Sequence, residues 1–188
     1  MYDIENIYQP KTLQEALDIL DNKDNLVIIA GGTDVLIKLH HGELCGSELL
    51  SLRDIEDLKG ININEQGDIE IGSMSSFSDI FRSDIINENI YSLSEAAVSM
   101  GGPQVRNMAT IGGNVCNGAV SADSATTLFA LNAELLLRTK NGERIIPIKE
   151  FYLGPGKVSI LPNEILIKII IRKDDYVGYK GNYIKFSN

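Results

Sequence analysis

The sequence contains few of the residues that metal sites and disulfide frameworks require. Its two cysteines, Cys45 and Cys116, are too few for a disulfide framework, a zinc site or an iron–sulfur cluster within this chain. The two histidines, His40 and His41, are adjacent and have no third ligand near them. We therefore expect them at a solvated helix end and not at a metal site.

Basic residues and long apolar runs are also scarce. The chain has 17 Lys and Arg against 26 Asp and Glu, a net charge of -9. Binding to nucleic acid or to an anionic membrane surface depends on Lys and Arg, so both are disfavoured. The acidic start Met1–Asn6 lacks an apolar signal region, and no run is long enough to span a bilayer. These observations predict a cytoplasmic protein with no nucleic-acid or membrane partner.

Helices and strands are predicted in a mixed order. Thr12–Glu15 is a capping box before apolar residues that share one helical face. We expect helices at 12–21, from 35 to an end at Gly42, and at 76–83, 91–100 and 123–131. We expect strands at 26–30, within 49–72, at 165–171 and 183–186, and a hairpin of 134–139 and 144–147. Because β-α-β units do not alternate steadily, we predict an α+β fold.

Two segments share a chemical layout that suits an anionic ligand. Ile28–Asp34 and Gln104–Asn114 each run from apolar residues through Gly-Gly to small polar residues. Glycines with positive φ would let backbone N–H groups reach a phosphate, and Thr33 and Thr110 would add hydroxyl donors. The residues alone leave open that each Gly-Gly is only a turn. The standard nucleotide motifs G-x-G-x-x-G and G-x-x-x-x-G-K followed by Ser or Thr are absent.

Five segments in a set order carry a family resemblance. Ala30–Asp34, Gln104–Asn114 and Cys116–Ala125 resemble the FAD-binding subunit of the xanthine dehydrogenase family of molybdenum hydroxylases. Phe151–Lys157 and Pro162–Leu166 resemble later motifs of that family, so the match covers essentially the whole chain.

The resemblance implies the two-lobed FAD-binding fold shared with vanillyl-alcohol oxidase and p-cresol methylhydroxylase. FAD would bind non-covalently between an N-terminal lobe at residues 1–55 and a second lobe at 56–188. Family members usually continue for about another hundred residues as a C-terminal domain. We expect that domain to be absent here, because the sequence stops at Asn188.

The resemblance also implies the cofactor-binding residues. Those expected around the pyrophosphate are Ile28, Ile29, Ala30, Gly31, Gly32, Thr33, Asp34 and Val35. Those expected elsewhere along FAD are Met100, Thr110, Gly113, Asn114, Asp123, Leu166 and Lys185. From the residues alone, Asp123 could equally cap the following helix, and Met100 could be core. Arg106 could pair with an acid or with the cofactor, and a structural ion pair is favoured. Cys116 is expected to pack beside the cofactor, and no residue is expected to be catalytic or to bind a metal.

The function that the resemblance implies is electron transfer. A partner subunit with a molybdenum cofactor would oxidise a purine, and a second partner with 2Fe–2S clusters would pass electrons to FAD and on to NAD⁺. Gly118–Ala125 is closest to purine dehydrogenases, which favours xanthine or hypoxanthine. Nicotinate, carbon monoxide or aromatic acyl-CoA oxidoreductases remain open. A self-sufficient flavin oxidase and a non-enzymatic module that has lost the flavin remain open as well.

Overall fold

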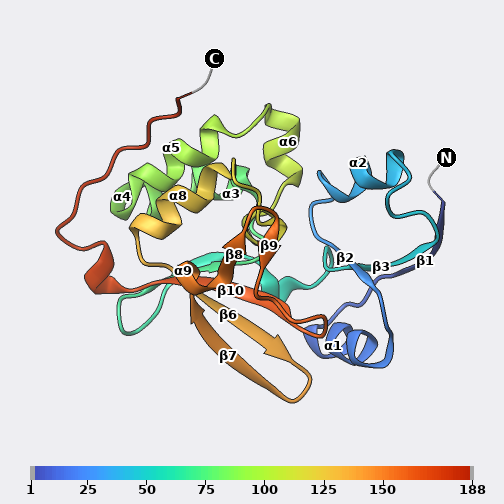
Figure 1. The fold of residues 1–188 in the computed structure, drawn as a ribbon. Helices are drawn as coiled ribbons and strands as arrows, with labels where there is room; N and C mark the ends of the chain where they lie inside the picture. The colour runs from blue at the N-terminus through green and yellow to red at the C-terminus, as the bar shows by residue number, and fades with distance from the viewer. Residues whose placement is uncertain (1–2, 187–188) are drawn as a thin grey trace.

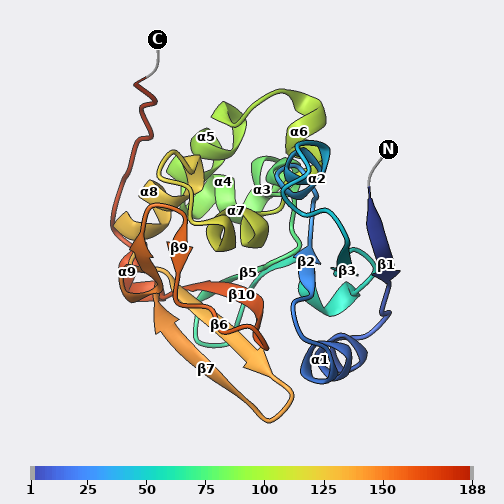
Figure 2. The ribbon, with the colours of Figure 1, turned by 45° about the vertical axis from the view of Figure 1, so that its right-hand side comes forward.

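The strands form two main sheets that lie side by side, as the computed structural model of residues 3–186 shows (Figures 1 and 2). The first sheet has the order β1-β3-β2, and both of its strand pairs are parallel. Its strands are β1 (Ile4–Tyr8), β2 (Val27–Ile29) and β3 (Ser47–Ser51). They are linked by the helices α1 (Leu13–Asn22) and α2 (Val35–His40). The expected strand at 26–30 and the first two expected helices are confirmed.

Helix α1 begins where the sequence predicts, but only half of the capping box forms. The Thr12 hydroxyl accepts a hydrogen bond from the Glu15 N–H at 3.2 Å. The Glu15 carboxylate accepts from the Lys11 N–H at 2.8 Å instead of from the N-cap residue. One face of the helix is buried against the first sheet, through Leu13, Ala16, Leu17 and Leu20.

The second sheet is antiparallel, with the order β4-β5-β10-β6-β7. Its strands are β4 (Ile61–Ile63), β5 (Ile69–Gly72), β6 (Glu134–Thr139), β7 (Gly142–Pro147) and β10 (Ile165–Ile171). The expected hairpin is β6 and β7. A two-stranded ribbon of β8 (Tyr152–Gly154) and β9 (Lys157–Val158) lies outside this sheet. The α+β prediction is confirmed.

Helices cover one face of the second sheet and bury its apolar side (Figure 1). They are α3 (Phe77–Arg82), α4 (Asp84–Asn89), α5 (Tyr91–Ser99), α7 (Ile111–Asn117), α8 (Asp123–Ala130) and α9 (Ile148–Phe151). Helix α6 (Pro103–Met108) has no buried residue and packs against α3. Two short 3-10 turns, η1 (Glu56–Leu58) and η2 (Lys173–Asp175), complete the regular elements of residues 3–186. Helices α3, α5 and α8 are where the sequence places them, whereas α4, α6, α7 and α9 were not predicted. Among these described residues, no helix has the length and apolar character needed to cross a bilayer.

A bulge in β10 changes which way its side chains face. Leu166 pairs with Leu137 and Lys168 pairs with Leu136, so Ile167 is an extra residue without a partner in β6. The extra residue puts Leu166 in the same core as Ile169, on the helix-covered face. The residues on either side of it, Ile165 and Ile167, pack with the core of the first sheet. Strand β10 therefore contributes to both cores.

The core under the first sheet also uses residues from later in the chain. Leu58, Met74 and Ile165 pack with the side chains of α1 and β3. The lobe boundary at residue 55 stays a prediction, and the two sheets share apolar contacts across it.

The expected strand at 183–186 is wrong. This segment follows the helical side of the molecule, where the Tyr183 N–H donates to the Glu95 carboxylate of α5 at 3.0 Å (Figure 1). A strand needs a neighbouring strand for its backbone hydrogen bonds. These residues have helices beside them, so their alternating pattern produces no strand.

Candidate functional site

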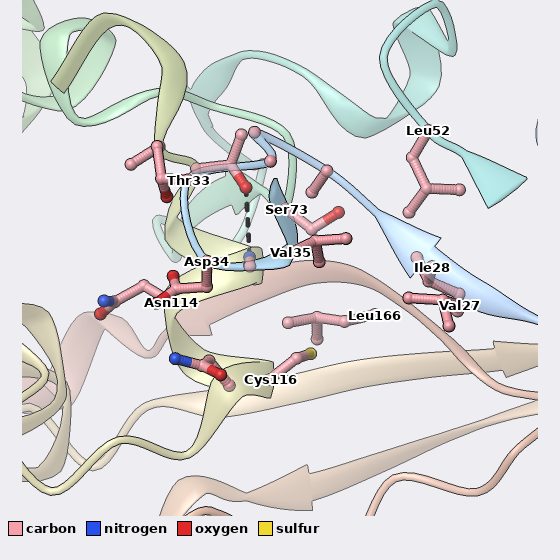
Figure 3. A pocket seen from close by; sticks show the side chains of 18 of the residues that line it. Val27, Ile28, Thr33, Asp34, Val35, Leu52, Ser73, Asn114, Cys116 and Leu166 are labelled. Carbon is pink, nitrogen blue, oxygen red and sulfur yellow. Dashed lines mark hydrogen bonds between the residues drawn. The ribbon is translucent and has the colours of Figure 1, made fainter. Parts of the chain in front are cut away.

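A cleft of about 730 Å³ lies where the two sheets meet. One side is formed by β2 and the loop after it, and the other by α7 and the start of β10 (Figure 3). This volume is in the range typical of sites for organic ligands and cofactors.

The loop after β2 presents a run of free backbone donors to the cleft. Residues Gly31–Asp34 line the cleft, and none of their N–H groups donates to another residue in the described part of the chain. Gly32 has φ +77°, which turns the chain from β2 towards α2 and which residues with a Cβ rarely adopt. Consecutive unpaired N–H groups in such a turn form a concave site for an anion.

Gly31 is required for a different reason, the close approach of two backbones. A Cβ on Gly31 would lie 1.9 Å from the Met108 carbonyl oxygen and 2.9 Å from the Ala109 Cα. The loop of the first sheet therefore touches the end of α6 backbone to backbone. We expected positive φ in both Gly-Gly pairs, but of these four glycines only Gly32 has it.

The second Gly-Gly pair is the first turn of helix α7 and not a loop. Thr110 is the N-cap, and its hydroxyl accepts from the Gly113 N–H at 3.1 Å. The Gly112 N–H donates to the Ser73 carbonyl at 2.9 Å. The prediction of bare amides here is wrong, because the helix start and the neighbouring chain already use them. Gly112 is needed for packing, since its Cβ would lie 2.6 Å from Ser73.

Polar side chains with spare hydrogen-bonding capacity lie in the cleft wall. Ser73 is only 4% exposed, and its hydroxyl has no partner among the described residues. Asn114 accepts from the Ser124 hydroxyl at 2.7 Å through its side-chain oxygen, which leaves the amide nitrogen to donate. A buried hydroxyl without a partner is destabilising, and a polar ligand would relieve this. The site therefore fits a ligand with several acceptors.

The rest of the cleft wall is largely apolar. Figure 3 shows the side chains of Ile28 and Leu52 on the side of the first sheet and Leu166 on the side of the second. Met100 also lines the cleft and is half-buried. Apolar walls of this kind suit an aromatic ring system.

Cys116 and Arg106 have structural contacts that distinguish their roles. Burial raises the pKa of the Cys116 thiol to about 12, so the group is a neutral thiol in the cleft wall and suits packing. The Arg106 guanidinium donates from one nitrogen to three carbonyls, at 3.0 Å to Val98, 3.1 Å to Met100 and 2.7 Å to Gly101. The predicted ion pair of Arg106 is therefore wrong, and the residue fixes the turn that carries Met100.

The structure brings together most of the predicted site residues. Twelve of the fifteen line the cleft: Ile28, Ala30, Gly31, Gly32, Thr33, Asp34, Val35, Met100, Thr110, Gly113, Asn114 and Leu166. Ile29, the last residue of β2, is outside the lining, although its neighbours Ile28 and Ala30 are part of it. Asp123 and Lys185 are the other two outside the lining.

Asp123 and Lys185 contact each other. The Asp123 carboxylate accepts from the Lys185 ammonium and from the Tyr183 hydroxyl, each at 2.8 Å. The hydrogen bond that the Lys185 ammonium donates to the Asp123 carboxylate raises the pKa of Lys185. Asp123 is the first residue of α8 after the N-cap Ala122 and makes no capping bond, so the expectation of a capping role is wrong. Whether either residue contacts a cofactor stays a prediction.

Sequence reasoning missed part of the cleft wall. Ser73 and Met74 follow β5, and no pattern in the sequence links them to the glycine segments. The residues before Leu166 were noticed as a family motif but were given no place in the site, although Pro162 and Glu164 line the cleft. The expectation of a solvated helix end at His40 and His41 is confirmed, since both are exposed at the end of α2.

The cleft of this α+β fold combines free backbone donors, spare hydroxyl and amide groups, and apolar walls. These features define a domain that binds a nucleotide-like cofactor. Residues 2–173 match the family model described as the FAD binding domain in molybdopterin dehydrogenase. The chain belongs to this family, and the predicted resemblance is confirmed.

Relatives and solved structures agree with this assignment. The chain is 40% identical over 167 residues to the xanthine dehydrogenase FAD-binding subunit of Escherichia coli O157:H7, covering 89% of the chain and 57% of the relative. It is 31% identical over 180 residues to the nicotinate dehydrogenase FAD-subunit of Eubacterium barkeri, covering 93% and 60%. A carbon monoxide dehydrogenase structure from Hydrogenophaga pseudoflava superposes with TM-score 0.87 at 28% identity, covering 92% and 60%. The chain thus spans 57% to 60% of the length of these proteins.

Proposed function

We propose that the cleft binds FAD without a covalent bond and that the N–H groups of Gly31–Asp34 hold its pyrophosphate. The observation that supports this most is the run of four residues whose N–H groups have no acceptor among the described residues and which line the cleft. A pyrophosphate supplies several charged acceptors at the spacing of successive N–H groups, and hydrogen bonds to charged acceptors are the strong ones.

Other cleft residues would hold the remainder of FAD. Thr33, Ser73 and Asn114 offer donors for its oxygens and nitrogens, and Leu166 and Met100 offer apolar surface for its ring system. When bound, FAD supplies one- and two-electron transfer chemistry, and the protein orients it and excludes water. No separate catalytic side chain is proposed in this chain.

At the level of the complex, the chain would be the FAD-binding component of a molybdenum hydroxylase. The molybdenum cofactor and the 2Fe–2S clusters would belong to partner subunits, and NAD⁺ would be the electron acceptor. A purine such as xanthine is favoured as the substrate of the complex, because identity to the xanthine dehydrogenase relative exceeds identity to the nicotinate dehydrogenase relative, 40% against 31%.

Comparing FAD with riboflavin tests the pyrophosphate assignment. Riboflavin has the same ring system but no pyrophosphate, so FAD should bind on the order of a hundredfold more tightly to the purified, flavin-free chain. Inorganic pyrophosphate should compete with FAD. Equal affinity for the two flavins would contradict the role of Gly31–Asp34, and a colourless protein that cannot take up FAD would contradict the function itself. NADH oxidation with a dye acceptor, measured with and without partner subunits, tests the proposed acceptor.

A further inference from the structure

The segment of residues 159–164 forms one wall of the cleft without regular secondary structure. It contributes Ile160, Leu161 and Pro162 to the lining and leads directly into Ile165 and Leu166 of β10. An irregular segment keeps a fixed shape only if specific contacts hold it, because its backbone has no ladder of hydrogen bonds.

One guanidinium bridges the two ends of this segment. Arg144 of β7 donates from Nε to one oxygen of the Glu164 carboxylate at 2.6 Å, and from a terminal nitrogen to the other at 2.8 Å. The same terminal nitrogen donates to the Ser159 carbonyl at 2.8 Å. The Glu164 carboxylate also accepts from the Leu161 N–H at 2.8 Å, inside the segment. The segment is therefore fixed at its start, middle and end by one ion pair.

The burial of Glu164 argues that the ion pair determines position, although the Arg144 side chain itself is 39% exposed. Glu164 is 2% exposed and lines the cleft, so its charge is largely removed from water. Buried ion pairs add little stability compared with apolar packing, but breaking one leaves a costly unpaired charge. Both oxygens of the Glu164 carboxylate accept hydrogen bonds, from Arg144 and from the Leu161 N–H. The position that these bonds impose on the segment explains this carboxylate better than a gain in stability does.

We propose that Arg144 and Glu164 are a positioning pair that holds residues 159–164 as a fixed wall of the FAD cleft beside Leu166. This rests on the proposed function, because the wall matters only if the cleft holds FAD. Neither residue needs to touch FAD, and both act through the main chain between Ser159 and Leu166.

Three single variants test the pair. Arg144→Lys keeps the charge but not the planar two-pronged contact, and Glu164→Gln keeps the shape but removes the charge. Glu70→Gln is the matched control. It breaks the 2.7 Å ion pair of Glu70 with Lys168, which lies on the same strand β10 but not in the described cleft lining.

Two measurements on the full chain separate positioning from stability. In the flavin-free chain, hydrogen exchange at the Leu161 amide should speed up about tenfold in both pair variants and not in Glu70→Gln. With FAD, both pair variants should raise the dissociation constant on the order of tenfold and shift the flavin absorption band, and the control should do neither.

Each outcome decides the proposal. If exchange is unchanged, the pair does not hold the segment. If exchange rises while FAD affinity and the flavin band match those of Glu70→Gln, the pair is only structural and the proposal is overturned. A wild-type chain that binds no FAD overturns the proposed function and this assignment together. If instead the wild-type chain binds FAD and the pair variants bind it equally well, the proposed function stands and only this assignment is overturned.

Discussion

Replacing Gly31 with alanine should separate the two sides of the cleft. The loop after β2 touches the end of α6 at this residue, with the added Cβ only 1.9 Å from the Met108 carbonyl oxygen. Real Cβ atoms do not approach other atoms closer than 3.0 Å, so one backbone must move away from the other. Gly31 itself does not have positive φ, so alanine adds no conformational strain and the effect comes from the contact alone.

The displacement is large compared with what a binding site tolerates. Moving from 1.9 Å to at least 3.0 Å displaces the loop by about 1 Å, and a misplacement of that size can reduce the effectiveness of a site about a hundredfold. Both neighbours are main-chain atoms and cannot rotate aside as a side chain would. Overpacking of this kind also destabilises a protein by about 1–3 kcal/mol. We therefore expect Gly31→Ala to weaken FAD binding between tenfold and a hundredfold.

Titration of the flavin-free chain with FAD, followed by flavin fluorescence, measures this effect. Gly142→Ala is the control, because a Cβ at Gly142 meets no atom within 4 Å and its φ is ordinary. Thermal unfolding of both variants separates lost affinity from lost folding. If Gly31→Ala binds FAD as the wild type does, with the same melting temperature, the contact with Met108 does not set the cleft and the reasoning fails.

Three further predictions concern the cleft, the C-terminal segment and acid stability. Gly113 lines the cleft, so Gly113→Leu should fill space that FAD needs and abolish FAD retention. Its Cβ would lie 2.9 Å from the Thr110 hydroxyl that caps α7, so the melting temperature should also fall, and unchanged flavin content would refute the assignment. Asp123→Asn removes a partly exposed ion pair with Lys185, so it should lower the free energy of unfolding by no more than about 1 kcal/mol. Trypsin should cleave after Lys185 faster in this variant, and an unchanged cleavage rate would count against the contact. Hydrogen bonds, first that from the Lys173 N–H, hold the pKa of Asp68 below its usual 3.8. The contribution of the ionised Asp68 carboxylate to the free energy of unfolding should be complete above about pH 4 and lost as pH falls through its folded-state pKa. Acid titration of Asp68→Asn should therefore show a flatter loss of stability than that of the wild type.

Local sequence patterns predicted those parts of the fold that depend on neighbouring residues. The capping residue Thr12 and the apolar spacing after it placed α1, and the strongly apolar run at Ile165–Ile171 placed β10. Helix α7 was missed because Gly112 and Gly113 in its first turn have low helix propensity. Helix α4 was missed because only Ser83 separates it from α3, and α9 because it has only four residues. The segment at 183–186 was wrongly predicted because the apolar pattern cannot reveal whether a neighbouring strand exists.

The candidate site was predictable where a single segment of the chain supplies the ligand-binding groups. The free N–H groups of Gly31–Asp34 depend on one local turn, and the glycine pattern identified them. The bulge that turns Leu166 towards the helix-covered face was not predicted, because it depends on pairing between β10 and β6. The buried hydroxyl of Ser73 and the Arg144–Glu164 pair also depend on contacts between distant segments, so no local pattern could predict them.

The two Gly-Gly pairs, which look alike in sequence, serve different physical needs. In the first, Gly32 provides a left-handed turn and Gly31 allows contact with α6, so the loop can leave its N–H groups free. In the second, the N–H of Gly112 is already used and its missing side chain lets α7 pack against Ser73. A phosphate held by backbone donors therefore belongs at the first pair. The second pair positions the helix that supplies Asn114, and its effect on FAD should come from shape and side chains.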